Sequence, residues 1–254
     1  MISPGLAARN LHHDLGWTQP SDFSIEEIAF SLGAIVKNQQ LNGAEGRILM
    51  TDNSAVISVN SDITHIGKRN FVLAHEIGHF TMHKGLKVFL DTNQTLSDWH
   101  KKGIHEQQAN EFASELLMPT ELFRKKVNGQ KLSLGLIEDV AAYFSVSLTA
   151  CFIKYSHVGR YPVMVIYIEK GIVKWKIFSN DFPFQYIAHE SKVTAWTVAG
   201  DYFNKGTVEA KPVKIDAIEW FPEDFQIKYK RGWKLWEQCF PVSDIGIISC
   251  LWSF

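Results

Sequence analysis

The sequence predicts an α+β fold, in which a small antiparallel sheet and several helices precede a β-rich C-terminal part. Helical periodicity of apolar residues dominates the chain up to His157, and two strand-like runs interrupt it at residues 46–61. From Val158 onward the apolar pattern alternates as in strands, and six of the eight tryptophans lie there. We therefore expect two domains, one over residues 1–157 and a β-rich one over residues 158–254.

The bulk composition is that of a globular chain. Its 254 residues are 46% hydrophobic, enough to bury a sizeable core, and its formal net charge of −1 lacks the basic excess that carries non-specific nucleic-acid binding. Three widely spaced cysteines, Cys151, Cys239 and Cys250, indicate reduced thiols rather than a disulfide framework. No secretory leader and no apolar run of about 18 residues is evident. We expect a soluble, cytoplasmic protein that binds neither nucleic acid nor membrane.

A capping box marks the first expected helix, which lies in Ser21–Val36. Ser24 can cap it, Glu27 follows three residues later, and Gly33 ends it. Residues 46–61 then have the pattern of two strands joined by the turn residues TDNS, which predicts an antiparallel hairpin. The sequence does not decide whether the second strand, AVISVNS, offers a free edge to a peptide or lies inside the sheet.

Further helices are expected on both sides of a less regular stretch. Residues 69–84 form one despite Gly78, which costs about 1 kcal/mol of helix propensity and therefore indicates close packing. Residues 85–103 lack a sustained period and are expected to form a loop or short hairpin. A second helix, IHEQQANEFASELLMP, ends at Pro119. The helical segment 131–157 carries two more around an FSVS joint, and their apolar flanks favour core helices over a DNA-binding helix-turn-helix.

The segment FVLAHEIGHF contains the candidate chemistry. On a helix His75 and His79 project from one face and can both bind one metal ion, while Glu76 is offset by about 100° and can reach a water beside that ion. In an H-E-x-x-H site the glutamate takes the proton of a water that attacks a carbonyl. The alternative is a buried helix with two hydrogen-bonded core histidines. The apolar flanks favour the metal, because buried histidines and a buried glutamate need polar partners.

A third ligand is expected on the next helix. His83 is unsuitable because it lies eight residues, or about 12 Å, beyond His75, and we expect it to contact a ligand or to pack. Glu106 shares the apolar face of its helix, where burial without a partner would be costly, although a satisfied surface carboxylate is the alternative. Asn110, on the same face, is placed to hydrogen-bond this carboxylate or a histidine. The predicted ligands are therefore His75, His79 and Glu106.

The remaining polar side chains of this second helix are expected elsewhere. Glu111 and Glu115 fall with Gln108 on its polar side and are expected to be solvated. His105 is adjacent to Glu106 but points away from the same face.

Three stretches in this order, AVISVNS, RNFVLAHEIGHFTMH and EQQANEFASELLMP, resemble the ImmA/IrrE family of zinc metallopeptidases over about residues 20–155. The resemblance implies a zincin-like metallopeptidase domain, with His75, His79 and Glu106 as ligands and Glu76 as catalytic base. It implies Zn²⁺ as cofactor, with Mn²⁺ or Fe²⁺ as alternatives. It also implies a protein substrate, a helix-turn-helix transcriptional repressor whose cleavage induces the genes that it silences.

Two functions stay open. The first is a zinc-dependent endopeptidase that cuts such a regulator. The second is a non-catalytic, metal-containing regulator or toxin–antitoxin component that acts by binding a protein or a ligand, in which case the aromatic residues of the tail line a pocket instead of a core. Glu76 favours the first, because a structural zinc site does not need it and usually has four protein ligands.

Overall fold

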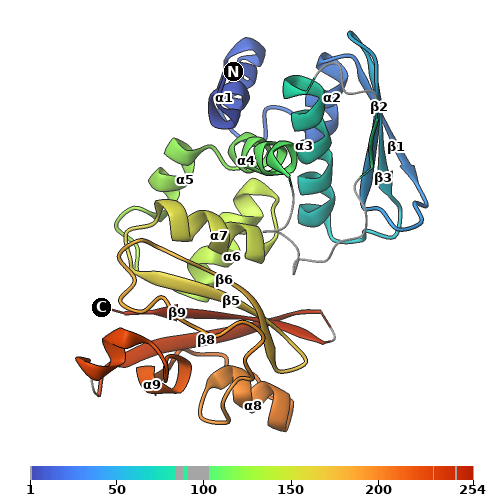
Figure 1. Cartoon of the computed structure of the whole chain (residues 1–254). Coiled ribbons are helices and arrows are strands. Elements are labelled where there is room, and N and C mark those ends of the chain that lie inside the picture. Colours follow the sequence, from blue (N-terminus) through green and yellow to red (C-terminus); the bar gives the residue numbers. More distant parts are fainter. Residues whose placement is uncertain (1, 84–87, 91–102, 231, 244, 254) are drawn as a thin grey trace. The chain divides into compact units, whose positions relative to one another are not determined.

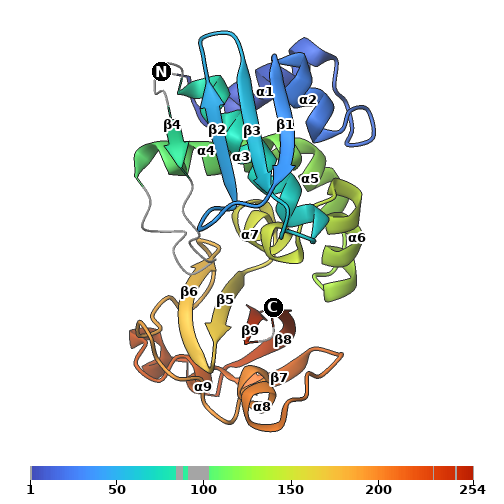
Figure 2. The same ribbon diagram turned by 90° about the vertical axis from the view of Figure 1, so that its right-hand side faces the viewer.

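The computed structural model describes all residues except 1, 84–87, 91–102, 231, 244 and 254. Contacts divide the chain into two compact units, residues 1–126 with 138–150 and residues 127–137 with 151–254. Each unit has its own sheet, and the second is rich in strands (Figures 1 and 2), which confirms the α+β class with a β-rich C-terminal part. It stays a prediction that the chain divides between residues 157 and 158 into two domains that fold independently.

The first unit places helices against one face of a four-stranded sheet, and Figure 1 shows α2 and α3 on that face. Its elements in chain order are α1 (Pro4–Leu15), α2 (Ile25–Ser31), β1 (Ala34–Gln39), β2 (Gly46–Met50), β3 (Ala55–Asn60), α3 (Ile66–Met82), β4 (Val88–Leu90), α4 (Ile104–Leu117) and α5 (Thr120–Val127). Helices α6 (Leu134–Phe144) and α7 (Leu148–Val158) each cross the division between the units.

The sheet has the strand order β1-β3-β2-β4. Strands β2 and β3 pair antiparallel, with Ile48 opposite Ile57, which confirms the predicted hairpin. β1 pairs parallel with the other side of β3. The strand AVISVNS is therefore internal to the sheet, and the idea that it offers a free edge to a peptide is wrong. The edge strands are β1 and β4.

The expected first helix is shorter in the structure. Its capping box is present, because Ser24 N donates to Glu27 Oε2 at 2.7 Å and Glu27 N donates to Ser24 Oγ at 3.2 Å. The helix ends at Ser31, and Gly33, with φ +85°, turns the chain directly into β1. The apolar run that follows Gly33 belongs to this strand, which the sequence did not predict. Residues 85–103 were expected to form a loop or short hairpin. The structure describes strand β4 within this stretch, and most of its other residues lie outside the described part.

Helices α3 and α4 pack closely at Gly78. A Cβ atom at this position would lie 3.1 Å from Phe112 Cδ1 and 3.2 Å from Ala109 Cα. The glycine therefore lets the backbones of the two helices approach, which is the packing reason expected from its cost in helix propensity. This close approach brings the N-terminal half of α4 beside the histidines of α3.

The joint between α6 and α7 packs against the first turn of α3. Gly67 allows the backbone of Val146 and Ser147 to lie directly on that turn, and Asn70 Nδ2 donates to Ser145 O at 3.0 Å. These contacts agree with the interpretation of the FSVS joint as part of a core.

No single described helix is long and apolar enough to cross a membrane; α6 and α7 pass such a test only as a pair, bent by 106°.

The second unit is built on a five-stranded antiparallel sheet with the order β6-β5-β9-β8-β7. Its elements are β5 (Val163–Glu169), β6 (Ile172–Phe178), α8 (Val198–Lys205), β7 (Val213–Asp216), α9 (Ala217–Trp220), a 3₁₀ turn (Phe225–Lys228), β8 (Lys234–Ser243) and β9 (Gly246–Trp252). Its core contains several aromatic residues of the tail, among them Phe184, Trp220 and Phe221. These rings therefore serve packing, whereas Trp196 is 78% exposed.

A buried carboxylate anchors α8 to this sheet. Glu237 of β8 accepts hydrogen bonds from the backbone N–H groups of Val198 and Ala199, in the first turn of α8, and from Ser249 Oγ. Burial raises the pKa of Glu237. No local pattern predicts this contact, because Glu237 stands in an ordinary strand pattern.

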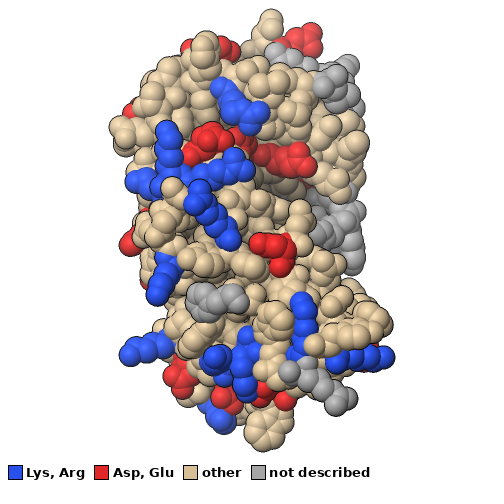
Figure 3. All heavy atoms as spheres, turned by 90° about the vertical axis from the view of Figure 1, so that its left-hand side faces the viewer, with Lys and Arg blue, Asp and Glu red and all other residues tan. Residues whose placement is uncertain are grey.

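Basic and acidic side chains are interspersed on the face of the molecule drawn in Figure 3. The described residues of this face therefore carry no uniformly basic field, in keeping with the net charge of −1. The absence of nucleic-acid binding stays a prediction.

Candidate metal centre

Helix α3 buries the H-E-x-x-H segment almost completely. His75 is 3% exposed, Glu76 is 1% exposed and His79 is 1% exposed. The helix begins after His65, whose Nδ1 accepts from Lys68 N at 3.3 Å. The apolar residues around the motif pack into the core of the unit, as the sequence predicted.

The structure brings the three predicted ligands together. The Nε2 atoms of His75 and His79 lie 3.0 Å apart, and each lies 3.3 Å from a carboxylate oxygen of Glu106. One ligand atom from each residue falls within 4.8 Å of the others, so this group could hold a metal ion. For tetrahedral zinc with Zn–N bonds near 2.0–2.1 Å, neighbouring ligand atoms are separated by about 3.3 Å, which matches the observed spacing.

The hydrogen bonds outside this group support the same chemistry. His75 Nδ1 lies 2.9 Å from Asn110 Oδ1, an oxygen that can only accept, so the proton of a neutral His75 is on Nδ1 and its Nε2 carries a lone pair. Asn110 thus contacts a histidine's second nitrogen, one of the two roles expected for it. A divalent cation satisfies lone pairs of Nε2 atoms and carboxylate oxygens that face one another in this way.

The ionisation states also suit a metal. Burial alone would raise the pKa of Glu106, but the rings of His75 and His79, which in their protonated forms donate to it and carry positive charge, hold that pKa well below its usual range, so Glu106 is a carboxylate. Burial lowers the pKa of His79. A carboxylate and a neutral imidazole are the forms that bind metal.

His83 contacts a ligand, as expected. It is 5% exposed, and its Nδ1 lies 3.0 Å from Nδ1 of His79. Its Nε2 lies 3.0 Å from Gln108 Oε1. Gln108, which was placed on the polar side of its helix, is half-buried, because its long side chain reaches back to the end of α3. His105 packs its ring against that of His83, with centroids 4.6 Å apart.

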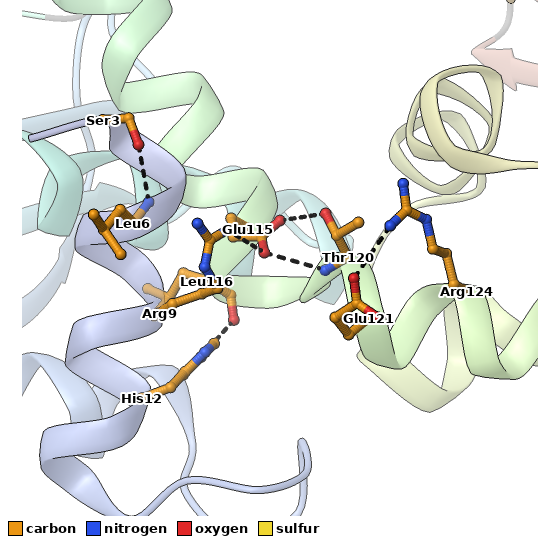
Figure 4. Close-up of polar contacts among 9 residues, drawn as sticks. All are labelled: Ser3, Leu6, Arg9, His12, Glu115, Leu116, Thr120, Glu121 and Arg124. Atoms are coloured by element: carbon orange, nitrogen blue, oxygen red, sulfur yellow. Dashed lines mark hydrogen bonds and ion pairs between the residues drawn. The ribbon is translucent and has the colours of Figure 1, made fainter.

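Glu115 was also expected to be solvated, and this is wrong. It is 6% exposed, receives hydrogen bonds from Thr120 Oγ1 at 2.6 Å and Thr120 N at 3.2 Å, and pairs with Arg9 Nη1 at 3.2 Å (Figure 4). The reason is α1, a helix that the sequence did not predict and that packs along α4. His12 of α1 also bonds Leu116 O at 3.0 Å. Contacts with α1 thus hold the C-terminal half of the helix that carries Glu106.

The carboxylate of Glu76 lies against strand β2 at Gly46. A Cβ atom at position 46 would lie 2.5 Å from Glu76 Oε1 and 2.7 Å from Val72 Cγ1. Only a glycine leaves room for the carboxylate here. Sequence reasoning missed this residue, because Gly46 stands at the start of a strand where a glycine usually marks a turn.

Comparison with known proteins agrees with this geometry. The family model described as IrrE N-terminal-like domain, of the peptidase M78 type, matches residues 31–152. Metallopeptidase ImmA of Bacillus subtilis (strain 168) is 33% identical over 131 residues, which cover 50% of this chain and 71% of that protein. The solved structure of a Mycobacterium tuberculosis transcriptional regulator is similar to this chain with a TM-score of 0.61. The match covers 98% of this chain and 86% of the regulator, and at 13% sequence identity it shows a likeness of fold alone. The chain belongs to the ImmA/IrrE family of metallopeptidases and carries its zincin-like domain.

Proposed function

We propose that the protein is a zinc-dependent endopeptidase that hydrolyses a peptide bond in a cognate regulatory protein. The observation that carries the proposal is the convergence of His75, His79 and Glu106, with the buried Glu76 next to the first ligand. The family resemblance supplies the substrate class, a helix-turn-helix transcriptional repressor, whose cleavage would induce the genes that it silences. Zn²⁺ suits two imidazoles and one carboxylate, and Mn²⁺ or Fe²⁺ would fit the same donors.

In this proposal the four side chains have separate tasks. His75, His79 and Glu106 hold the ion, and Zn²⁺ when bound acidifies water and polarises the substrate carbonyl. Glu76 accepts the proton of the attacking water on its carboxylate and passes it to the nitrogen of the leaving amine. At 1% exposure, the side chain of Glu76 has little contact with bulk water, which limits competition for that proton.

The rival function is a non-catalytic, metal-containing regulator that binds a protein or a ligand, and the second unit gives its ligand-binding form less support. A cavity in that unit lies between β6, residues 186–194 and residues 219–223, and its volume is about 70 Å³. Small-molecule sites usually occupy roughly 300–1,000 Å³. The cavity therefore suits a few waters better than an effector molecule, and the peptidase proposal rests on the better-formed site.

The test uses a helix-turn-helix repressor, taken as the candidate substrate from the same organism. Protein loaded with Zn²⁺, Mn²⁺ or Fe²⁺ is mixed with the repressor, and intact mass follows the products, with chelator-treated protein as the control. We expect two fragments whose masses sum to that of the repressor plus one water, and none after chelation. Tight binding without cleavage under all three metals would instead favour the non-catalytic regulator.

Gly46 provides a test of how the base is positioned. We expect Gly46→Ala to displace the Glu76 carboxylate, because the new methyl group would overlap with Oε1 and with Val72. Turnover should fall by at least about tenfold with metal content unchanged, and overpacking should cost about 1–3 kcal/mol of unfolding free energy. Repressor cleavage, elemental analysis and chemical denaturation measure these three quantities.

Gly135→Ala is the matched control. A Cβ atom at this position of α6 meets nothing within 4 Å, and its φ is not in the left-handed region. This alanine should leave turnover unchanged and should not destabilise the protein. Parental turnover in Gly46→Ala would show that Glu76 does not depend on this contact.

A further inference from the structure

The outer hydrogen bonds of the two histidine ligands differ. His75 Nδ1 meets an amide oxygen of Asn110, which can only accept. His79 Nδ1 meets a second imidazole nitrogen, Nδ1 of His83, at 3.0 Å. Either nitrogen of such a pair can be the donor, so the protons must be arranged in one particular way for His79 to present a lone pair to a metal.

Metal binding through Nε2 of His79 determines that arrangement. The proton of His79 is then on Nδ1, which donates to Nδ1 of His83. The proton of a neutral His83 is consequently on Nε2, which lies 3.0 Å from Gln108 Oε1 and donates to it. Each contact in the series from His79 through His83 to Gln108 thus joins one donor to one acceptor.

The backbone holds His83 where this series needs it. α3 ends at Met82, and His83, the C-cap residue, donates its backbone N–H to His79 O at 2.9 Å. His83 is therefore bonded to His79 through both main chain and side chain. Gln108, at the other end, lies on α4 two residues beyond Glu106. The series links the last ligand of α3 to the helix that supplies the third ligand.

We propose that His83 and Gln108 are a positioning pair that fixes His79 in its Nδ1–H tautomer and so sets the metal affinity of the site. The inference rests on the proposed function, because it takes His79 as a ligand. Neither residue contacts substrate in this account. They act on the metal through His79, much as a carboxylate orients a zinc-bound histidine in other proteins.

Zinc affinity of matched variants tests the proposal. His83→Phe keeps a ring but removes the acceptor, and should weaken Zn²⁺ binding about 10- to 100-fold. His83→Asn returns an acceptor oxygen near the position of Nδ1, and should recover most of that loss. His105→Phe is the control, since it keeps the ring contact with His83 at a position outside the hydrogen-bonded series. Competition with a chromophoric chelator measures all three affinities.

Nitrogen-15 NMR of the Zn²⁺-loaded parent protein tests the proton positions without any substitution. We expect His83 to carry its proton on Nε2 and none on Nδ1. A proton on Nδ1 of His83, or Zn²⁺ binding by His83→Phe at parental affinity, would overturn the inference. If His83→Phe fails to fold, the parental spectrum and the affinity of His83→Asn still decide.

His79→Ala separates failure of this inference from failure of the proposed function. If His79→Ala loses Zn²⁺ and His83→Phe does not, only the positioning role is wrong. If His79→Ala also binds Zn²⁺ like the parent, the metal site itself is misassigned and the proposed function fails with it.

Discussion

Glu76→Gln is expected to lower repressor cleavage by about 10²-fold or more while the metal stays bound. Glutamine keeps the size and hydrogen-bonding capacity of the side chain but cannot accept the proton of the attacking water, and loss of a general base costs about 10²- to 10⁴-fold. Glu76 is not one of the three converging side chains, so metal content should not change. Single-turnover cleavage and elemental analysis measure the two effects.

The matched control is Glu111→Gln, which makes the same chemical change at an exposed position of α4. It should cleave the repressor at the parental rate. Parental cleavage by Glu76→Gln would remove the assignment of Glu76 as base, whatever the metal content.

Glu106→Ala is expected to abolish stoichiometric metal binding. The parent should bind about one equivalent of divalent metal per chain. The variant loses the one carboxylate among the three predicted ligands. Loss of a residue that only hydrogen-bonds a ligand lowers metal affinity by roughly 10- to 100-fold, and loss of a ligand itself should lower the Zn²⁺ affinity further. Elemental analysis after dialysis, with chelator competition, gives both numbers.

Glu111→Ala controls for loss of a carboxylate from the same helix, because this residue is exposed and lies outside the cluster. Full metal retention in Glu106→Ala would show that the third ligand is another residue. Equal loss in both variants would point to a general effect on α4 instead of ligation.

Local patterns were enough to predict the elements that carry the site. The capping box at Ser24, the H-E-x-x-H helix and the apolar face of α4 are all properties of residues within a few turns of one another. Placement of Glu106 beside the histidines followed from the cost of burying a carboxylate, and the structure shows the three side chains together.

Features that depend on distant partners were not predictable in the same way. β1 exists because Gly33 turns the chain so that Ala34–Gln39 pair with β3, and no local pattern separates this run from the end of a helix. The internal position of β3 follows from the same pairing. Burial of Glu115 depends on α1, which lies about a hundred residues away in the sequence. The sequence does contain weak capping signals for α1, because Ser3 and Pro4 stand at its start and Gly16 at its end.

Anomalous diffraction from crystals of metal-loaded protein, measured across the absorption edge of zinc, tests whether His75, His79 and Glu106 are the ligands of one ion. We expect one anomalous peak per chain, about 2.0–2.2 Å from Nε2 of His75, Nε2 of His79 and a carboxylate oxygen of Glu106. A peak bound by other residues, or fully loaded protein with no peak at these three side chains, would contradict it.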